Sequence, residues 1–525
     1  MVADVAVLVV GAGPTGLLLA SELHRRRVEC RVIDAHPAPL HWDRATVVHP
    51  RSLEVFESLR ILEPVLAAGV KQRMARLHSG GNVLGEIDLS VCGSRYGFNI
   101  GISEEVVESM LAEYLHKKGG KVVRSARLVE LRDREDGLLA TIEREGATEQ
   151  VLARWVVGCD GLHSTTRQLS GIELTGHDIT EPWAVFDATL MGWPDSYEAN
   201  YAYLDNVPVI LTALPDRRWR VYLRPSSADS DLVADASSTI NRYLPAIGFD
   251  DIANPTRFHC HTKIASRFRS GRILLAGDAA HVCSPAQGHG MNSGLQDAFN
   301  LAWKLALVCH AHCTPALLDS YEAERRPVAE TITVSGDAVE LAQSVTDPAE
   351  RRARDDTLRA VFADPTSRHH EVIAEAELDV DYSGSPIVMG DENDALAPGQ
   401  RLPDTIEVVL AGGEVCMLHQ LTNRECHTAL LIGGLSVPGE SLAQLDSAIQ
   451  ARSGTFLITA TIVLMACSDD QNSYARLAPA AADQLGIGGI TLLVMRPDGH
   501  VGLRADRNHI EALMTYHALL VSGRT

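Results

Sequence analysis

Continuous apolar runs followed by glycine predict strands that are buried on both faces. The first run covers residues 5–10 (Val-Ala-Val-Leu-Val-Val), and an amphipathic stretch with helical spacing follows at 17–26. A second apolar run, 28–33, ends in Asp34. Strands that are apolar at every position are typical of a parallel sheet covered by helices. The pattern therefore predicts a strand–helix–strand unit.

The turn between the first strand and the helix carries three glycines with the spacing of a dinucleotide-binding loop. Gly11 permits a tight turn, Gly13 leaves room for a pyrophosphate, and Gly16 lets helix and strand pack closely. Asp34 ends the second strand, where an acid suits a ribose hydroxyl pair. Glycines placed for packing alone are the alternative, but the full order of features favours a nucleotide. The loop does not separate FAD from NAD.

Two later apolar runs end in similar turns. Residues 155–158 lead into Asp160-Gly161, which is either a helix cap or a ligand turn. Residues 272–276 lead into Gly277-Asp278, and a glycine-rich loop and a second helix start follow at 284–294. Backbone N–H groups of such a loop, and the positive end of the helix behind it, favour an anionic ligand edge. A flavin ring that becomes anionic on reduction suits this field.

The middle of the chain reads as strands, and the end as a separate unit. Runs within 179–269 alternate with turns and predict a sheet, with a strand-like stretch near 76–100. Four aromatic residues of this sheet could line a substrate pocket, although aromatics on a sheet more often pack in a core: Tyr201, Tyr203, Trp219 and Tyr222. The Pro/Gly-rich opening near 396 begins a third unit of strands and a hairpin, which lacks a CxxC pair.

Bulk composition excludes several classes of partner. The 525 residues carry a net charge of −21, which repels phosphate backbones and anionic lipid, so we expect neither nucleic acid nor membrane partners. The longest late apolar run, 457–467, is shorter than the ~20 residues of a membrane span. Scattered cysteines and no signal peptide indicate a cytoplasmic protein. Cys309 and Cys313 with two nearby histidines cannot all face one metal on a helix, so no metal is expected.

These motifs, with the segment 319–327 (Asp-Ser-Tyr-Glu-Ala-Glu-Arg-Arg-Pro), resemble the single-component FAD-dependent aromatic hydroxylases, flavoprotein monooxygenases that include phenol and polyketide hydroxylases. The resemblance covers essentially the whole chain. It implies an α/β protein: a Rossmann-like FAD-binding fold, an inserted β-sheet substrate domain and a C-terminal thioredoxin-like domain. The expected boundaries are 1–75, 101–178 and 270–395 for the FAD domain, 76–100 and 179–269 for the sheet domain, and 396–525 for the last domain.

The resemblance also implies roles for individual residues. The residues expected to bind noncovalent FAD are Gly11, Gly13, Gly16, Asp34, Arg44, Asp160, Gly277, Asp278, Gly290, Met291 and Asn292. Pro285 is expected against the reactive flavin edge, and the N–H groups of Met291 and Asn292 near the pyrimidine carbonyl. Arg44 matches a flavin-contacting arginine and, with His49, completes the expected catalytic set; His49 is a candidate base, and a structural histidine is the favoured alternative.

Two positions depart from the pattern of the resembling family. Relatives usually carry Gln where this chain has Glu104, and a carboxylate beside FAD phosphates is costly, so Glu104 is expected to bond a ribityl hydroxyl or turn away. Phenol hydroxylase has an acid where this chain has Thr46. The identity of a phenol-activating base therefore stays open.

The reaction implied by the resemblance is aromatic hydroxylation. NADPH or NADH reduces FAD, O2 adds to give a C4a-hydroperoxide, and one oxygen atom passes to an electron-rich ring; the protein supplies orientation and excludes water. A flavin halogenase is disfavoured because no tryptophan lies in a Trp-x-Trp-x-Ile-Pro run. A flavoprotein oxidase or reductase and a catalytically idle flavin scaffold stay open. The third domain is expected to serve packing and homodimer contacts.

Overall fold

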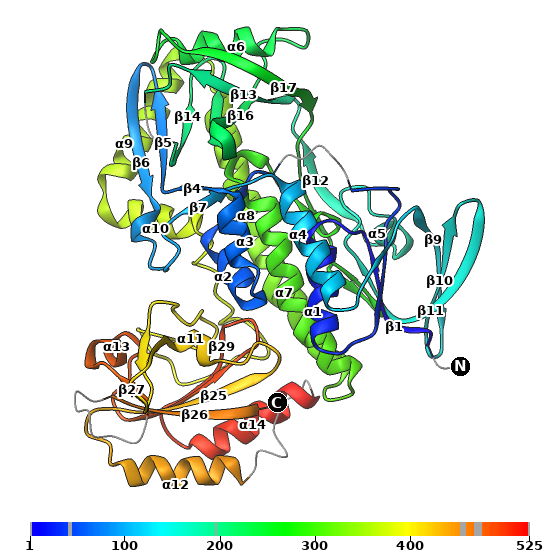
Figure 1. Cartoon of the computed structure of the whole chain (residues 1–525), viewed down its shortest axis with the longest axis vertical. Helices are drawn as coiled ribbons and strands as arrows, with labels where there is room; N and C mark the ends of the chain where they lie inside the picture. The colour runs from blue at the N-terminus through cyan, green and yellow to red at the C-terminus, as the bar shows by residue number, and fades with distance from the viewer. Residues whose placement is uncertain (1–2, 40–44, 195–196, 452–457, 467–474, 523–525) are drawn as a thin grey trace.

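The computed structural model describes residues 3–39, 45–194, 197–451, 458–466 and 475–522. Figure 1 shows three tiers: a sheet with β13 and β16 at the top, a helical layer beside a second sheet in the middle, and the C-terminal unit below. The predicted α/β fold class is confirmed.

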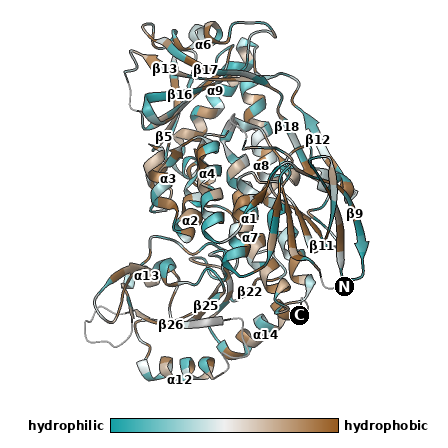
Figure 2. Ribbon diagram, turned by 45° about the vertical axis from the view of Figure 1, so that its right-hand side comes forward, coloured by the Kyte–Doolittle hydropathy of each residue, from teal (hydrophilic) through white to brown (hydrophobic). Residues whose placement is uncertain are grey.

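The middle tier is built around the apolar strands at the start of the chain. The eight-stranded sheet has the order β19-β20-β11-β1-β2-β8, with β10 on β11 and β9 on β10. Its strands are β1 (Val5–Val10), β2 (Cys30–Ile33), β8 (Val122–Val123), β9 (Ala126–Arg134), β10 (Gly137–Arg144), β11 (Ala147–Gly158), β19 (Arg269–Ser270) and β20 (Ile273–Leu275). β1 pairs in parallel with both β2 and β11. In Figure 2 the strands beside β11 are mostly hydrophobic, as a doubly covered sheet requires.

Helices cover this sheet and connect to the loops that follow its strands. They are α1 (Pro14–Arg25), α2 (Pro50–Leu59), α3 (Leu62–Ala68), α4 (Glu104–Lys117), α5 (Thr165–Leu169), α7 (His289–Cys309) and α8 (Asp319–Ser344). α1 packs against α4 and α7, and nearly all of α7 is buried. Two small sheets lie nearby, β3 (Val47–Val48), β7 (Asn99–Gly101) and β4 (Val70–Gln72), and β12 (Leu174–Asp178), β18 (His261–Ala265) and β21 (His281–Val282).

The upper sheet combines two distant parts of the chain. Its order is β17-β13-β16-β15-β14-β5-β6. The strands are β5 (Met74–Ser79), β6 (Asn82–Asp88), β13 (Trp183–Met191), β14 (Ala199–Tyr203), β15 (Val209–Ala213), β16 (Arg218–Leu223) and β17 (Gly248–Phe258). Helix α6 (Leu232–Ile240) covers one face, while α9 (Pro348–Ala363) and α10 (Pro365–Glu375) pack against β6.

The C-terminal unit has its own eight-stranded sheet, in the order β22-β29-β28-β25-β26-β27-β23-β24. Its strands are β22 (Met389–Gly390), β23 (Glu407–Val409), β24 (Val415–Met417), β25 (His427–Gly433), β26 (Ile458–Ala466), β27 (Ala475–Leu477), β28 (Ile490–Met495) and β29 (Val501–Ala505). Its helices are α11 (Leu418–Leu421), α12 (Gly439–Gln450), α13 (Pro479–Gln484) and α14 (His509–Ser522).

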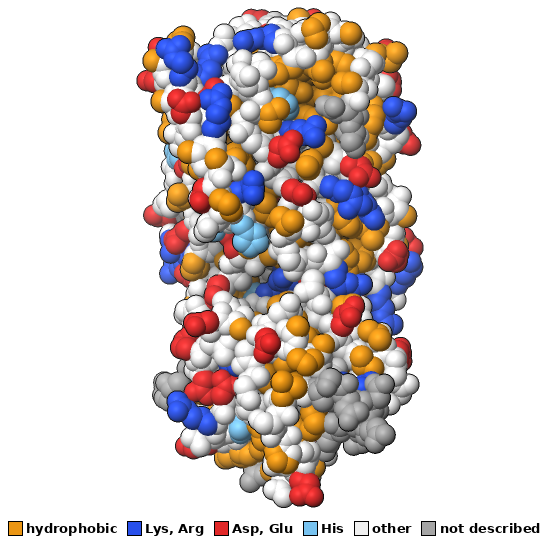
Figure 3. All heavy atoms as spheres, turned by 90° about the vertical axis from the view of Figure 1, so that its left-hand side faces the viewer, with side chains coloured by type: hydrophobic (Ala, Val, Ile, Leu, Met, Phe, Trp, Pro, Cys, Tyr) orange, Lys and Arg blue, Asp and Glu red, His pale blue; other side chains and the backbone are white. Residues whose placement is uncertain are grey.

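On the face drawn in Figure 3, acidic and basic side chains are interspersed, and hydrophobic side chains gather in its upper part. No helix among the described residues is long and apolar enough to cross a membrane. None of the described cysteines forms a disulfide.

Candidate functional site

A cavity of about 660 Å³ lies where the upper sheet meets the middle tier. That volume is in the range of small-molecule and cofactor sites. Its wall joins elements that are far apart in the sequence. Among its lining residues are Gly13, Thr46, Glu104, Gly161, Tyr222, Asp278, Pro285, Gly290 and Met291.

The three glycines of the first turn have separate physical roles. Gly11 has a φ of +101°, and a Cβ there would lie 2.2 Å from the carbonyl oxygen of Cys159. A Cβ on Gly16 would lie 2.1 Å from the carbonyl oxygen of Gly11. Gly13 differs, because a Cβ on it would meet no described atom within 4 Å. Since Gly13 lines the cavity, this open space fits a pyrophosphate group lying over the turn.

Asp34 is held beside that turn. Its Oδ2 accepts a hydrogen bond from the Ala12 amide at 2.7 Å, and its Oδ1 accepts one from the His36 amide at 2.8 Å. Arg124 lies 3.6 Å from the same carboxylate. These contacts fix the acid at the end of β2, where a ribose is expected.

The Asp160 carboxylate forms hydrogen bonds within its own segment, and Asp160 is not among the residues that line the cavity. It accepts hydrogen bonds from the Thr166 amide at 2.9 Å and the Thr166 hydroxyl at 3.0 Å, and from Ser164. Ser164 is the N-cap of the short helix α5, as the capped-helix alternative had it, and Asp160 adds a second acceptor for its first turn. Gly161, the next residue, is the one that lines the cavity.

The Gly277-Asp278 loop presents an acid to the cavity. Gly277 has a φ of +59°, and a Cβ on it would lie 2.7 Å from the Thr15 hydroxyl. Its amide donates to Oδ2 of Asp297 at 3.0 Å. The Asp278 side chain is exposed and lines the cavity, so it can meet ligand hydroxyls.

A buried ion-pair network, which the sequence did not reveal, holds this loop. Asp297 on α7 is fully buried; its Oδ1 accepts from Arg325 Nε at 2.7 Å, and its Oδ2 lies 2.7 Å from His281 Nε2. Burial alone would raise the pKa of Asp297, but the charges of His281 and Arg325 hold it below its ordinary value. A permanently charged Asp297 can therefore bond the Gly277 amide at neutral pH.

The N-terminus of α7 forms the next part of the wall. Gly288 is its N-cap with a φ of +73°, and Gly288, Gly290 and Met291 line the cavity. The Asn292 side chain is fully buried, and its Nδ2 donates to the carbonyls of Val47 at 2.9 Å and Gly288 at 2.8 Å. Asn292 thus ties the helix to β3, and only its backbone N–H is at the helix start.

Pro285 lines the cavity from the loop before α7, and a buried carboxylate anchors its neighbour. Ser284 donates to Glu340 of α8, and Trp183 of the upper sheet donates to the same carboxylate through Nε1 at 3.0 Å. Arg224 pairs with Glu340 as well. Glu340 was missed because nothing in its own helical segment marks it; its partners come from the sheet and the loop.

The upper sheet turns only some of its predicted aromatics toward the cavity. Tyr222 lines it, and the Tyr222 hydroxyl lies 3.1 Å from Oγ1 of Thr46, another lining residue. Trp219 and Tyr203 do not line it, a correction; both are buried on the opposite face, in the core beneath α6. Tyr201 borders the cavity, but its ring packs in that same core, 4.9 Å between centroids from Trp193.

The predicted catalytic residue His49 lies behind the cavity wall. His49 is fully buried and is not among the lining residues, so the structure places this predicted base one layer behind the wall. Its amide donates to Oδ1 of Asn292 at 3.0 Å. Arg44 lies outside the described residues. Glu104 starts α4 and lines the cavity, and its Oε2 accepts from the Ala45 amide at 3.4 Å.

Comparison with known proteins agrees with this site. The FAD binding domain family matches the chain over residues 4–335. The chain is 30% identical to 6-methylpretetramide 4-monooxygenase of Streptomyces rimosus, over 96% of this chain and 91% of that protein. It is 34% identical to pentachlorophenol 4-monooxygenase of Sphingobium chlorophenolicum over 63% of each chain. The structure of anhydrotetracycline hydroxylase from Streptomyces rimosus superposes with a TM-score of 0.75 at 26% identity, covering 98% of this chain and 99% of that one.

Proposed function

We propose, from the premise that the chain belongs to the FAD binding domain family and is a flavin-dependent aromatic hydroxylase, that it uses NADH or NADPH and O2 to hydroxylate a phenolic or polycyclic aromatic substrate. The bound FAD would supply the oxidising chemistry through a C4a-hydroperoxide. The observation that carries the proposal is the shared cavity, because nucleotide-side, flavin-side and sheet residues line one space.

The cavity wall suits FAD from the pyrophosphate to the flavin ring. Gly13 leaves open space for the pyrophosphate, the exposed Asp278 suits ribityl hydroxyls, and the N-terminus of α7 suits the pyrimidine carbonyl. Pro285 lines the same cavity, and its neighbour Ser284 shares the Glu340 carboxylate with Trp183 of the upper sheet. The substrate is then expected between Pro285 and the sheet.

The nature of the relatives' substrates supports a fused-ring ligand. The names of two of the relatives place tetracycline-type or pretetramide ring systems with those proteins. Apolar side chains such as Ile210, Phe258 and Leu204 line the sheet side of this cavity, and they favour an aromatic ligand.

The hydroxyl pair of Tyr222 and Thr46 is the best-placed group to orient a phenol. Both side chains line the cavity and lie in hydrogen-bond contact at 3.1 Å. A phenol must shift toward phenolate to become nucleophilic, and a hydrogen-bond chain of hydroxyls can receive or pass its proton. Tyr222 replaces His49 as the proposed proton-handling residue.

The test is a screen of phenols and polycyclic quinones for stimulation of NAD(P)H oxidation, with the products checked by mass. A product heavier by one oxygen atom supports hydroxylation. NAD(P)H consumption that yields only peroxide supports an oxidase, and no stimulation by any aromatic supports an idle scaffold.

A matched pair of variants sharpens the screen. Tyr222→Phe removes the hydroxyl at the cavity wall, whereas Tyr203→Phe removes one from the opposite face of the same sheet. We expect Tyr222→Phe to lower product yield per NAD(P)H at least tenfold, about 1.4 kcal/mol, and Tyr203→Phe to leave it unchanged. Equal effects of both would show that Tyr222 acts only through the fold.

A further inference from the structure

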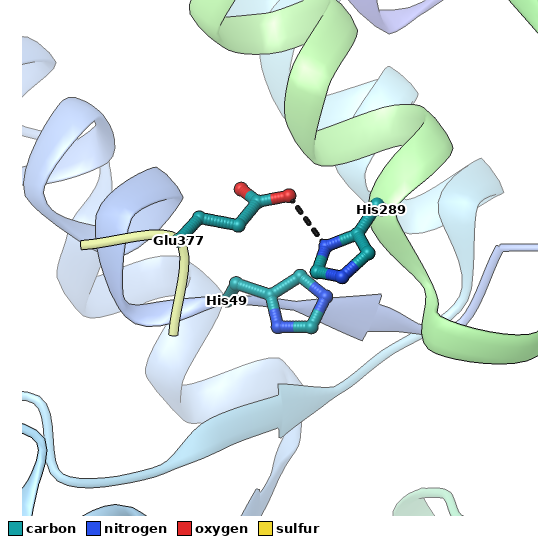
Figure 4. Close-up of side chains that lie close together, drawn as sticks. All are labelled: His49, His289 and Glu377. Atoms are coloured by element: carbon teal, nitrogen blue, oxygen red, sulfur yellow. Dashed lines mark hydrogen bonds and ion pairs between the residues drawn. The ribbon is translucent and has the colours of Figure 1, made fainter. Parts of the chain in front are cut away.

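A buried group of three ionisable side chains lies at the N-terminus of α7. His49, His289 and Glu377 come from three segments: the residue before α2, the first residue of α7, and the turn after α10. One ring nitrogen of each histidine and one carboxylate oxygen of Glu377 all lie within 4.8 Å of one another. All three side chains are buried. Figure 4 shows the two imidazole rings side by side, with the Glu377 carboxylate directed at His289.

Glu377 is held in an unfavourable backbone conformation. Its φ is +55°, the left-handed region that disfavours residues with a Cβ. Both carboxylate oxygens are nevertheless used: Oε1 lies 2.8 Å from His289 Nδ1, and Oε2 accepts from Gln296. Strained residues of this kind persist where the surrounding contacts over-determine them. The contacts here are all to the first turns of α7.

The surroundings of His289 favour its charged form. Burial lowers the pKa of His289, but the hydrogen bond and charge of Glu377 outweigh burial, so the pKa is raised. Glu375 and Asp379 act in the same direction from the same segment. On the other side of His289, the His49 ring stacks on its imidazole ring at 5.1 Å between centroids. The buried Nε2 of His49 has no hydrogen-bond partner among the described residues.

His289 directly precedes the cavity wall. The next two residues, Gly290 and Met291, line the cavity, and their amides are proposed to meet the pyrimidine end of the flavin. This end gains negative charge when the flavin is reduced. We propose that His289, kept protonated by Glu377, stabilises the reduced flavin relative to the oxidised one. This inference rests on the proposed function only for the presence and orientation of FAD.

The test is the midpoint potential of the bound flavin, measured by spectroelectrochemistry without substrate. His289→Gln keeps a hydrogen-bonding side chain but removes the charge. It is expected to weaken the preference for reduced flavin about tenfold, a shift of about −30 mV for a two-electron couple. His312→Gln, at an exposed position after the other end of α7, is the matched control and should shift nothing. An unchanged potential in His289→Gln, or an equal shift in the control, overturns the proposal.

A second variant separates charge from local structure. Glu377→Gln leaves the imidazole in place but removes the carboxylate that retains its proton. Between pH 6 and pH 8.5 its potential should fall further than that of the unmodified protein, because without the carboxylate the imidazole loses its proton at a lower pH. If His289→Gln does not retain FAD, this pH dependence decides, and a potential that does not depend on pH beyond the unmodified protein's own slope overturns the proposal.

Two further outcomes are distinguishable. Dialysis against EDTA should leave the potential unchanged, because a proton supplies the charge; a shift would assign the cluster to a metal ion and overturn the proposal. A purified protein without FAD would contradict the proposed function, whereas a protein with FAD and an unchanged potential in both variants contradicts only the role of His289.

Discussion

The two ends of the cofactor site are built in different ways. At the nucleotide end, Gly11, Gly13 and Gly16 shape the wall through the backbone alone, within six residues. At the flavin end, the Gly277-Asp278 loop depends on buried charges such as Asp297 from a helix twenty residues later. A backbone rule needs only local residue types, while a charge network needs partners that the fold brings together.

The network at the flavin end continues into the C-terminal unit. Glu324 precedes Arg325 on α8 and is fully buried; its two oxygens accept from Arg496 at 2.7 and 2.8 Å, and Lys304 donates to it at 2.6 Å. Asp498, two residues after Arg496, accepts from Trp303 Nε1 at 3.0 Å. A unit without any cofactor motif is thus fastened to the helices that carry the flavin loops.

The largest expected effect comes from removing the ion pairs between α8 and the C-terminal unit. Arg496→Gln leaves the buried Glu324 and Asp498 without their guanidinium, and removing one partner of a buried pair costs about 3–5 kcal/mol. Urea denaturation, monitored through the release of FAD, should show this loss in the free energy of unfolding. The matched control, Arg507→Gln, affects a pair at 3.4 Å whose arginine is 79% exposed, and should cost about 0–1 kcal/mol. Comparable losses in both would contradict the role of the network.

The same contrast explains what the sequence could predict. The strand, the three glycines and Asp34 follow each other in the order that a nucleotide turn requires, so that end could be predicted from local residue types. Glu340 and Asp297 could not, because helical segments give no sign of which distant loop they will bond. A period-two reading of β16 would have improved the pocket prediction: Trp219 and Tyr222 are three residues apart and must face opposite sides.

At the nucleotide end, two alanine variants separate packing from ligand contact. Gly16→Ala forces a Cβ to 2.1 Å from the Gly11 carbonyl, so overpacking should destabilise the fold by about 3 kcal/mol. Gly13→Ala meets no described atom within 4 Å, so stability should not change while FAD binding weakens. Thermal melts of the FAD-free proteins and FAD titrations check this. A destabilised Gly13→Ala variant with normal FAD affinity would reverse the assignment.

At the flavin end, ligand contact and support of the loop belong to two different residues, Asp278 and Asp297. Its side chain is exposed into the cavity, and Asp297 holds the loop from behind. Asp278→Ala should therefore keep the fold but weaken FAD binding by about 1.5–3 kcal/mol, the value of hydrogen bonds to a charged group. Equilibrium dialysis measures the affinity, and Asp278→Asn, which retains part of the bonding, should fall between. Full FAD retention in the alanine variant would show that the loop binds through its backbone alone.

The last prediction is a loss of stability at acidic pH, which arises at the junction between α7 and the C-terminal unit. His427 on β25 is buried against Trp303, at 5.3 Å between ring centroids, and neither of its nitrogens has a hydrogen-bond partner among the described residues. Burial lowers the pKa of His427 to about 3. The unfolded chain, with an ordinary pKa near 6.5, binds more protons between these values, so stability is complete above about pH 6.5 and is lost as the pH falls toward 3. At pH 5 the loss is about 2 kcal/mol for this histidine. His427→Leu removes this contribution, so the unmodified protein should lose about 2 kcal/mol more than the variant between pH 7 and pH 5 in urea denaturation. Parallel losses in both proteins would mean that His427 titrates alike in the folded and unfolded chain, and that the junction admits water around its ring.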